Sequence, residues 1–221
     1  MRRLIFVMLL FVMPALVAFP AIVFAGKIKG KVTVKGLRTP ADIVVYLTNA
    51  PATDVDLSKA KFVMDQQNLA FIPHVLPIPV GSTVLFPNND KVDHNVFSMS
   101  RTKEFNLGSY KPGESQPVVF DKPGIVEVRC DVHAEMAAYI LVMKNPYFGI
   151  TDEKGNFEIP DSGYLHRVGL EGIADLPPGE YSLKTRHEKL ETQKASIIVP
   201  DTGDAVVQLD LKRGVPGVLY K

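Results

Sequence analysis

The chain has 221 residues, with 25 Lys and Arg, 24 Asp and Glu, and a formal net charge of +1. This even balance argues against a nucleic-acid partner, which would need an excess of positive charge. It also provides no net field for steering a strongly charged protein, so any docking must rest on local patches.

The first 25 residues have the pattern of an export signal. Arg2 and Arg3 precede an apolar run over residues 4–24, and Ala25 closes it. This order predicts a signal peptide cleaved after Ala25 and a periplasmic mature protein that is free of the membrane. The run is also long enough to span a bilayer, so an uncleaved N-terminal membrane anchor is the alternative. Cleavage leaves 196 residues, enough for two small domains.

Two strands are expected at the start of the mature chain. Residues 27–36 alternate apolar and basic side chains over most of their length, which predicts a half-buried strand with one solvent-facing side. Residues 43–47 are Ile-Val-Val-Tyr-Leu and predict a more fully buried strand. These two strands could be the first strands of the domain that follows directly, or they could share a domain with strands much later in the chain.

A metal-ligand pattern occupies the middle of the chain. A strand is expected over residues 124–130 and another over residues 139–143. The loop between them reads Cys130-x-x-His133-x-x-Met136, and His94 lies about three dozen residues before it. A thiolate, two imidazoles and a thioether form a soft, nitrogen-rich donor set, which favours copper over cations that prefer carboxylate oxygen. One bound copper is the simplest prediction.

Cys130 is the single cysteine of a chain that is expected to be exported. Exported proteins usually pair their cysteines in disulfides, so a lone thiol needs a reason. A buried, inert thiol is one reason. A thiolate bound to a metal is the other, and the His and Met side chains at loop spacing favour it. His74 is interpreted as a hydrogen-bonded surface group, and His166 and His187 are assigned no role.

The last third of the chain reads as short strands separated by turns. Strands are expected within residues 147–159, which contain a tight turn, and then over residues 177–184, 195–199 and 205–211. Short strands with turn signals at these intervals predict an antiparallel sandwich.

Over about residues 61–144 the sequence resembles the cupredoxins, the small blue copper proteins. The resemblance rests on His94 followed by the loop from Cys130 to Met136, which is similar to the short ligand loop of plastocyanin- and amicyanin-like members. It implies a type 1 copper site. The implied equatorial ligands are His94, Cys130 and His133, the axial ligand is Met136, and Asn95 is the supporting residue that ties the His94 loop to the Cys130 loop.

The flanking segments resemble a carboxypeptidase regulatory-like domain, which is a transthyretin-like sandwich. The matching pieces are Thr-Asp-x-x-Gly-x-Phe at residues 151–157, Leu-Pro-Pro-Gly-x-Tyr at residues 176–181, and the opening Gly30-Lys31-Val32. Together the two resemblances imply an all-β chain of two antiparallel Greek-key β-sandwiches, with the copper domain nested inside the other. Residues 161–175 are an extra stretch in this pattern, interpreted as a surface loop or a docking element.

The nested layout sets the expected boundaries. They are 1–25 for the signal peptide, 26–58 and 145–214 for the regulatory-like sandwich, 59–144 for the cupredoxin, and 215–221 for a C-terminal tail. In the tandem alternative, the opening strands of residues 26–58 belong to the cupredoxin.

Four protein ligands leave no open coordination position, which favours an electron carrier over an enzyme. The resemblance implies an exported protein that shuttles single electrons between periplasmic redox partners, such as a cytochrome or a dehydrogenase-like protein. The implied docking point is the exposed edge of His133, beside Val132 and Ala134. The alternatives are a copper storage or delivery protein, and a carbohydrate- or protein-binding sandwich with an accessory copper site. The last of these rests on fold analogy alone.

Overall fold

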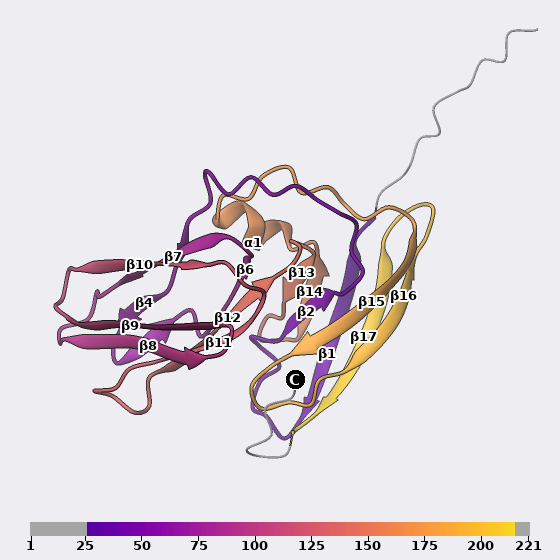
Figure 1. Ribbon diagram of the computed structural model, residues 1–221. Coiled ribbons are helices and arrows are strands. Elements are labelled where there is room, and N and C mark those ends of the chain that lie inside the picture. The colour runs from indigo at the N-terminus through magenta and orange to yellow at the C-terminus, as the bar shows by residue number, and fades with distance from the viewer. Residues whose placement is uncertain (1–25, 215–221) are drawn as a thin grey trace, which may run out of the picture.

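The computed structural model describes residues 26–214, so the expected signal peptide and C-terminal tail lie outside the described residues. Within this range the chain forms seventeen strands and one short helix, which confirms the all-β prediction. Its strands form two β-sandwiches, one on the left and one on the right of Figure 1. None of the described helices has the length and apolar character needed to cross a membrane.

The inner sandwich, residues 62–143, is continuous in sequence. One sheet has the strand order β6-β12-β11-β8-β9, the facing sheet has the order β10-β7-β3, and β4 pairs with β5 in a small hairpin. The strands are β3 (Phe62–Val63), β4 (Asp65–Gln67), β5 (Ala70–Ile72), β6 (Val75–Pro79), β7 (Ser82–Pro87), β8 (His94–Ser100), β9 (Lys103–Tyr110), β10 (Ser115–Phe120), β11 (Gly124–Arg129) and β12 (Ala137–Met143).

The outer sandwich is built from segments on both sides of the inner one. Its sheets have the strand orders β14-β1-β17 and β13-β2-β15-β16. The strands are β1 (Ile28–Lys35), β2 (Val44–Leu47), β13 (Phe148–Ile150), β14 (Asn156–Ile159), β15 (Gly179–Arg186), β16 (Lys194–Val199) and β17 (Ala205–Lys212). Both early strands thus pair only with strands that follow the inner sandwich, as a nested layout requires. The domain boundaries themselves stay a prediction.

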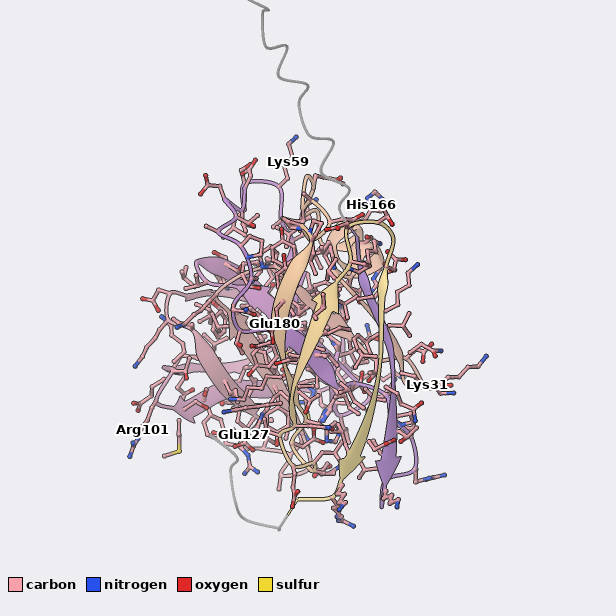
Figure 2. All side chains as sticks on the ribbon, turned by 90° about the vertical axis from the view of Figure 1, so that its right-hand side faces the viewer. Lys31, Lys59, Arg101, Glu127, His166 and Glu180 are labelled. Carbon is pink, nitrogen blue, oxygen red and sulfur yellow. The ribbon has the colours of Figure 1, made fainter. Side chains whose placement is uncertain are left out.

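Alternation of apolar and charged side chains explains why one face of a strand is buried and the other is exposed. In β1, Ile28 and Val32 are fully buried whereas Lys29 and Lys31 are exposed, as expected for a strand with one wet side. Lys31 and Glu180 stand on the outer surface of this sandwich (Figure 2).

Three strand pairs are parallel, whereas the sequence predicts antiparallel sandwiches. The pairs β1/β17, β6/β12 and β3/β7 are parallel. Parallel neighbours need a long connection between them, and each of these pairs is separated by other strands of the chain.

The extra stretch of residues 161–175 contains the helix α1 (Ser162–Arg167). The Asp161 side chain caps its N-terminus by accepting from the Tyr164 N–H at 2.9 Å. Tyr164 and Leu165 are buried in the same hydrophobic cluster as the inner sandwich, and the Tyr164 hydroxyl donates to the Pro77 carbonyl in β6. Part of this stretch is therefore a packing element that joins the two sandwiches (Figure 1).

Candidate metal centre

Three strand ends bring the predicted donors together at one end of the inner sandwich. His94 is the first residue of β8, and Cys130 directly follows β11. β8 and β11 pair antiparallel through Phe97 and Arg129, which places His94 beside the end of β11. Antiparallel pairing of β11 with β12 then closes the loop that carries His133.

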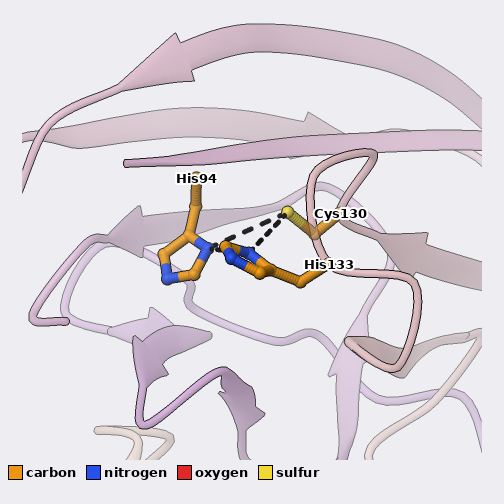
Figure 3. Close-up of side chains that lie close together, drawn as sticks. All are labelled: His94, Cys130 and His133. Carbon is orange, nitrogen blue, oxygen red and sulfur yellow. Dashed lines mark hydrogen bonds between the residues drawn. The ribbon is translucent and has the colours of Figure 1, made fainter. Parts of the chain in front are cut away.

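The donor atoms form a compact triangle (Figure 3). His94 Nδ1 lies 3.1 Å from His133 Nδ1, and Cys130 Sγ lies 3.8 Å from each of these nitrogens. The centre of a triangle with these sides is about 2.1 Å from every corner, close to the ~2.0–2.3 Å lengths of metal–imidazole and metal–thiolate bonds. The spacing of the three donor atoms thus fits one metal ion, and their softness and trigonal arrangement suit copper.

The triangle is screened from solvent on most sides. His94 is fully buried and Cys130 is 4% exposed, whereas His133 is only partly buried. Val132, next to His133 in the chain, is 58% exposed, and Ala134 is exposed as well. Among the three donors, His133 is therefore the one through which the centre reaches the surface.

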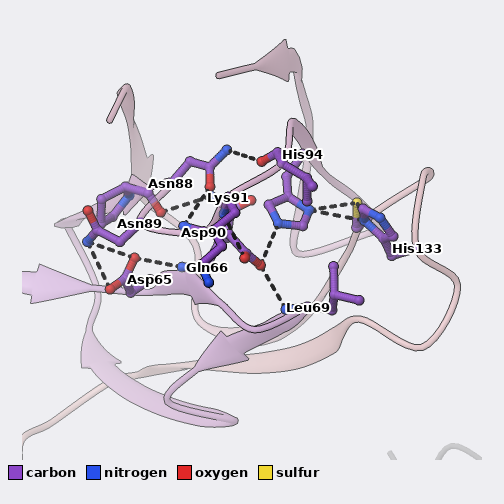
Figure 4. Close-up of polar contacts among 12 residues, drawn as sticks. Asp65, Gln66, Leu69, Asn88, Asn89, Asp90, Lys91, His94 and His133 are labelled. Atoms are coloured by element: carbon purple, nitrogen blue, oxygen red, sulfur yellow. Dashed lines mark hydrogen bonds and ion pairs between the residues drawn. The ribbon is translucent and has the colours of Figure 1, made fainter. Parts of the chain in front are cut away.

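Asp90 holds the far side of the His94 ring (Figure 4). His94 Nε2 lies 3.0 Å from Asp90 Oδ2, which also accepts from the Leu69 N–H at 2.7 Å. An N–H on Nε2 leaves Nδ1 as a lone pair that faces the other donors. The Leu69 N–H is the largest cause that lowers the pKa of Asp90, to about 2, with further contributions from the Lys91 N–H and from His94. The carboxylate therefore stays ionised at any physiological pH.

Asn88 fixes the loop that carries Asp90 and His94. It is fully buried, and its Nδ2 donates to the carbonyls of Val92 at 2.9 Å and Tyr110 at 3.2 Å. Its Oδ1 accepts from the Asp90 N–H at 3.1 Å. Buried amides that are bonded in this way specify one loop conformation, because any other leaves polar atoms unpaired.

The sequence does not assign these roles to Asp90 and Asn88. In the sequence, Asn88-Asn89-Asp90 indicates only the turn before the first histidine, which is a common use of these residues. The available signal is the position of Asp90 four residues before a candidate ligand histidine, because such histidines usually donate their second N–H to a carboxylate or carbonyl.

Met136 and Asn95 are placed less directly. Met136 is 1% exposed, its N–H donates to the His133 carbonyl at 3.0 Å, and its carbonyl accepts from the Cys130 N–H at 3.3 Å. Asn95 Nδ2 donates to Asn106 Oδ1 at 2.9 Å, which ties β8 to β9. Asn95 Oδ1 is buried without a partner among the described residues. The axial role of Met136 and the expected tie from Asn95 to the Cys130 loop stay predictions.

No family model matches the chain. It is similar to a purple cupredoxin from Nitrosopumilus maritimus, with 28% identity over 38% of this chain and 99% of that one, at a TM-score of 0.34. A reduced mutant of amicyanin matches 45% of this chain and 98% of that one with 18% identity and a TM-score of 0.36. A copper-containing nitrite reductase from Thermus scotoductus SA-01 matches 52% of this chain and 28% of that one with 25% identity and a TM-score of 0.38.

These TM-scores are too low to assign a function to this chain. The likeness of the outer sandwich to a carboxypeptidase regulatory-like domain stays a prediction.

Proposed function

We propose that this chain is an exported copper protein that carries single electrons between periplasmic redox proteins. His94 Nδ1, Cys130 Sγ and His133 Nδ1 are the equatorial ligands, and the Met136 thioether is the weak axial one. Copper, when bound, supplies a one-electron couple. The observation that carries the proposal is the preformed triangle of one thiolate and two imidazole nitrogens, which is the donor set of electron-transfer copper sites.

The surrounding residues support rapid electron transfer by holding the ligands still. The Asp90 carboxylate fixes His94, and backbone hydrogen bonds from Cys130 to Met136 and from Met136 to His133 close the ligand loop. Rigid ligands need little rearrangement when the metal changes its charge. Electrons would enter and leave through His133, the partly exposed donor, against a partner such as a cytochrome or a dehydrogenase-like protein.

Copper storage or delivery would use the same donors but would need rapid exchange of the ion. The burial of His94 and Cys130 disfavours it, since a chelator has no direct access to either side chain. Four protein ligands also leave no position for a substrate, so we propose a carrier with no catalytic activity of its own.

Adding Cu(II) to residues 26–221 and recording the visible absorption spectrum tests this function. We expect an intense thiolate-to-copper charge-transfer band that is absent in Cys130→Ser and lost or strongly changed in His133→Gly. His166→Asn is the matched control, because His166 is 82% exposed on its side chain and lies outside the donor triangle.

A colourless or merely pale protein would contradict the electron-carrier proposal. Loss of Cu(I) to bathocuproine disulfonate within seconds would instead favour copper delivery. Slow loss together with a reversible redox potential would support the carrier.

A further inference from the structure

A cleft separates the two sandwiches at the end of β11 and β12 that lies away from the metal centre. It has a volume of about 370 Å³ and is lined by residues of β2 and β15 on the outer side and of β11 and β12 on the inner side. β11 runs from Gly124 in the cleft to Arg129 beside Cys130, so about 20 Å of strand separates the two places. The cleft is therefore independent of the donor triangle.

The walls of the cleft differ in character. Ile125, Leu141 and Met143 supply apolar side chains from β11 and β12. Three cationic side chains also line it: Lys184 and Arg186 from β15, and Lys144 directly after the end of β12. The uncharged polar residues of the lining are Tyr46, Thr48 and Asn145. No Asp or Glu is among the described residues that line the cleft. Cations beside an apolar wall suit a ligand that combines a negative charge with an apolar body.

The charge available to a ligand comes from the two lysines. Neither Lys144 nor Lys184 takes part in an ion pair or a side-chain hydrogen bond among the described residues. Arg186 is different, because it is 7% exposed, it interacts with its own surroundings, and burial lowers the pKa of its guanidinium. The two lysine ammonium groups therefore keep all of their donors for a molecule that enters the cleft.

We propose that this cleft binds a small organic anion, specifically a carboxylate with an aromatic or branched apolar body. The carboxylate would face Lys144 and Lys184, because ammonium groups donate charge-assisted hydrogen bonds to it. The apolar body would lie against Leu141 and Ile125. The volume is at the lower end of the ~300–1,000 Å³ typical of ligand pockets, which often lie between structural units.

Calorimetric titration of the mature chain, residues 26–221, with 2-naphthoate and with uncharged 2-naphthamide tests the proposal. We expect 2-naphthoate to bind at least about tenfold more tightly than 2-naphthamide, a difference of ~1.4 kcal/mol. Lys144→Gln combined with Lys184→Gln should weaken 2-naphthoate binding at least about tenfold. Thr48→Trp, which narrows the cleft without changing its charge, should weaken binding as well.

Lys194→Gln is the matched control, since Lys194 pairs with Lys184 across β15 and β16 but does not line the cleft. It removes one charge from the same sheet and should leave the affinity within about twofold. Far-UV circular dichroism and urea unfolding of each variant exclude a loss of fold.

Three outcomes would overturn the proposal: no binding of 2-naphthoate at millimolar concentration, equal affinity for the amide, or equal weakening by Lys194→Gln. The titration is read without copper, so its failure leaves the proposed electron-carrier function untouched.

Discussion

An imidazole binds a metal only through a nitrogen that lacks a proton, and Asp90 supplies this condition for His94. The carboxylate lies 3.0 Å from Nε2 and is itself held by the Leu69 and Lys91 N–H groups. Leu69 belongs to the tight turn between β4 and β5, where it adopts a φ of 60°. The orientation of one candidate ligand therefore depends on a hairpin about two dozen residues earlier in the chain.

Replacing Asp90 with Asn should lower copper affinity about 10–100-fold, because a neutral amide neither orients the His94 ring as firmly nor raises its basicity. Competition with a copper chelator measures this affinity. Asp93→Asn is the control, since Asp93 precedes His94 in the same loop but is exposed. Equal affinities of the two variants would show that Asp90 does not position His94.

The sequence is informative about the donors because thiolate, imidazole and thioether chemistry is local to Cys130, His133 and Met136. It is much less informative about their supports. The hydrogen bond from His94 Nε2 to Asp90 depends on the loop conformation that Asn88 imposes. Asn88 acts through the carbonyls of Val92, before β8, and of Tyr110, at the end of β9. The spacing of residues in the sequence does not predict such hydrogen bonds.

The turn between β15 and β16, in the outer sandwich, contacts the inner sandwich through Glu188. Its carboxylate lies 3.3 Å from His74 Nε2, which precedes β6. Burial by itself raises the pKa of Glu188, but the hydrogen bond with His74 and the charge of His187 outweigh it, so the pKa falls to about 2. The same hydrogen bond raises the pKa of His74. The contact is thus an ion pair under mildly acidic conditions.

A carboxyl with a lowered pKa stabilises the fold above its ordinary pKa and loses that contribution as the pH falls. For Glu188 the loss should run from about pH 4.5 down to about pH 2. Glu188→Gln should therefore lower the free energy of unfolding by on the order of 2 kcal/mol at pH 6, with the gap narrowing at pH 3. Urea unfolding of the copper-free protein measures both values.

Glu171→Gln serves as the control, because Glu171 pairs with His166 but is 70% exposed on its side chain. It should change stability little at either pH. A constant gap between the wild type and Glu188→Gln across this range would contradict the role given to the ion pair.

Strand positions follow closely from the sequence, whereas the helix and the strand order do not. Apolar alternation places β1 and β11 within one or two residues of their observed ends, because burial of one face dictates that pattern. The helix α1 has six residues, including Gly163, and little intrinsic tendency to form alone. Its stability comes from burying Tyr164 and Leu165 against the inner sandwich. Such distant contacts, like the parallel pairing of β1 with β17, leave no local signal.

For the whole molecule, the pairing of β1 and β2 with strands that follow the inner sandwich predicts the effect of cleaving the chain between β2 and β3. Insertion of a specific protease site after the exposed Ala52, followed by cleavage, should give two pieces that stay together in native gel filtration. β1 lies between β14 and β17, and β2 lies between β13 and β15. Each strand of the N-terminal piece is therefore hydrogen-bonded to two strands of the C-terminal piece. The pieces should separate in urea.

The uncut insertion variant is the control for any effect of the added residues. Separation of the pieces under native conditions would contradict the nested layout. The sequence suggests this layout only through matching fragments at both ends of the chain, since the ladders that hold them together span more than one hundred residues.

The parallel ladder between β1 and β17 also determines how the molecule responds to force. Its register runs from Ile28 beside Ala205 to Lys35 beside Lys212, so the incoming and outgoing ends of the described chain leave from opposite ends of the ladder. Tension between them pulls the two strands past each other, and all of the ladder's hydrogen bonds share the load. The inner sandwich is connected to the outer one through β2 and β13, and these two strands pair with each other outside this line of tension. A chain held at both ends should therefore keep its donor triangle intact until the outer sandwich unfolds.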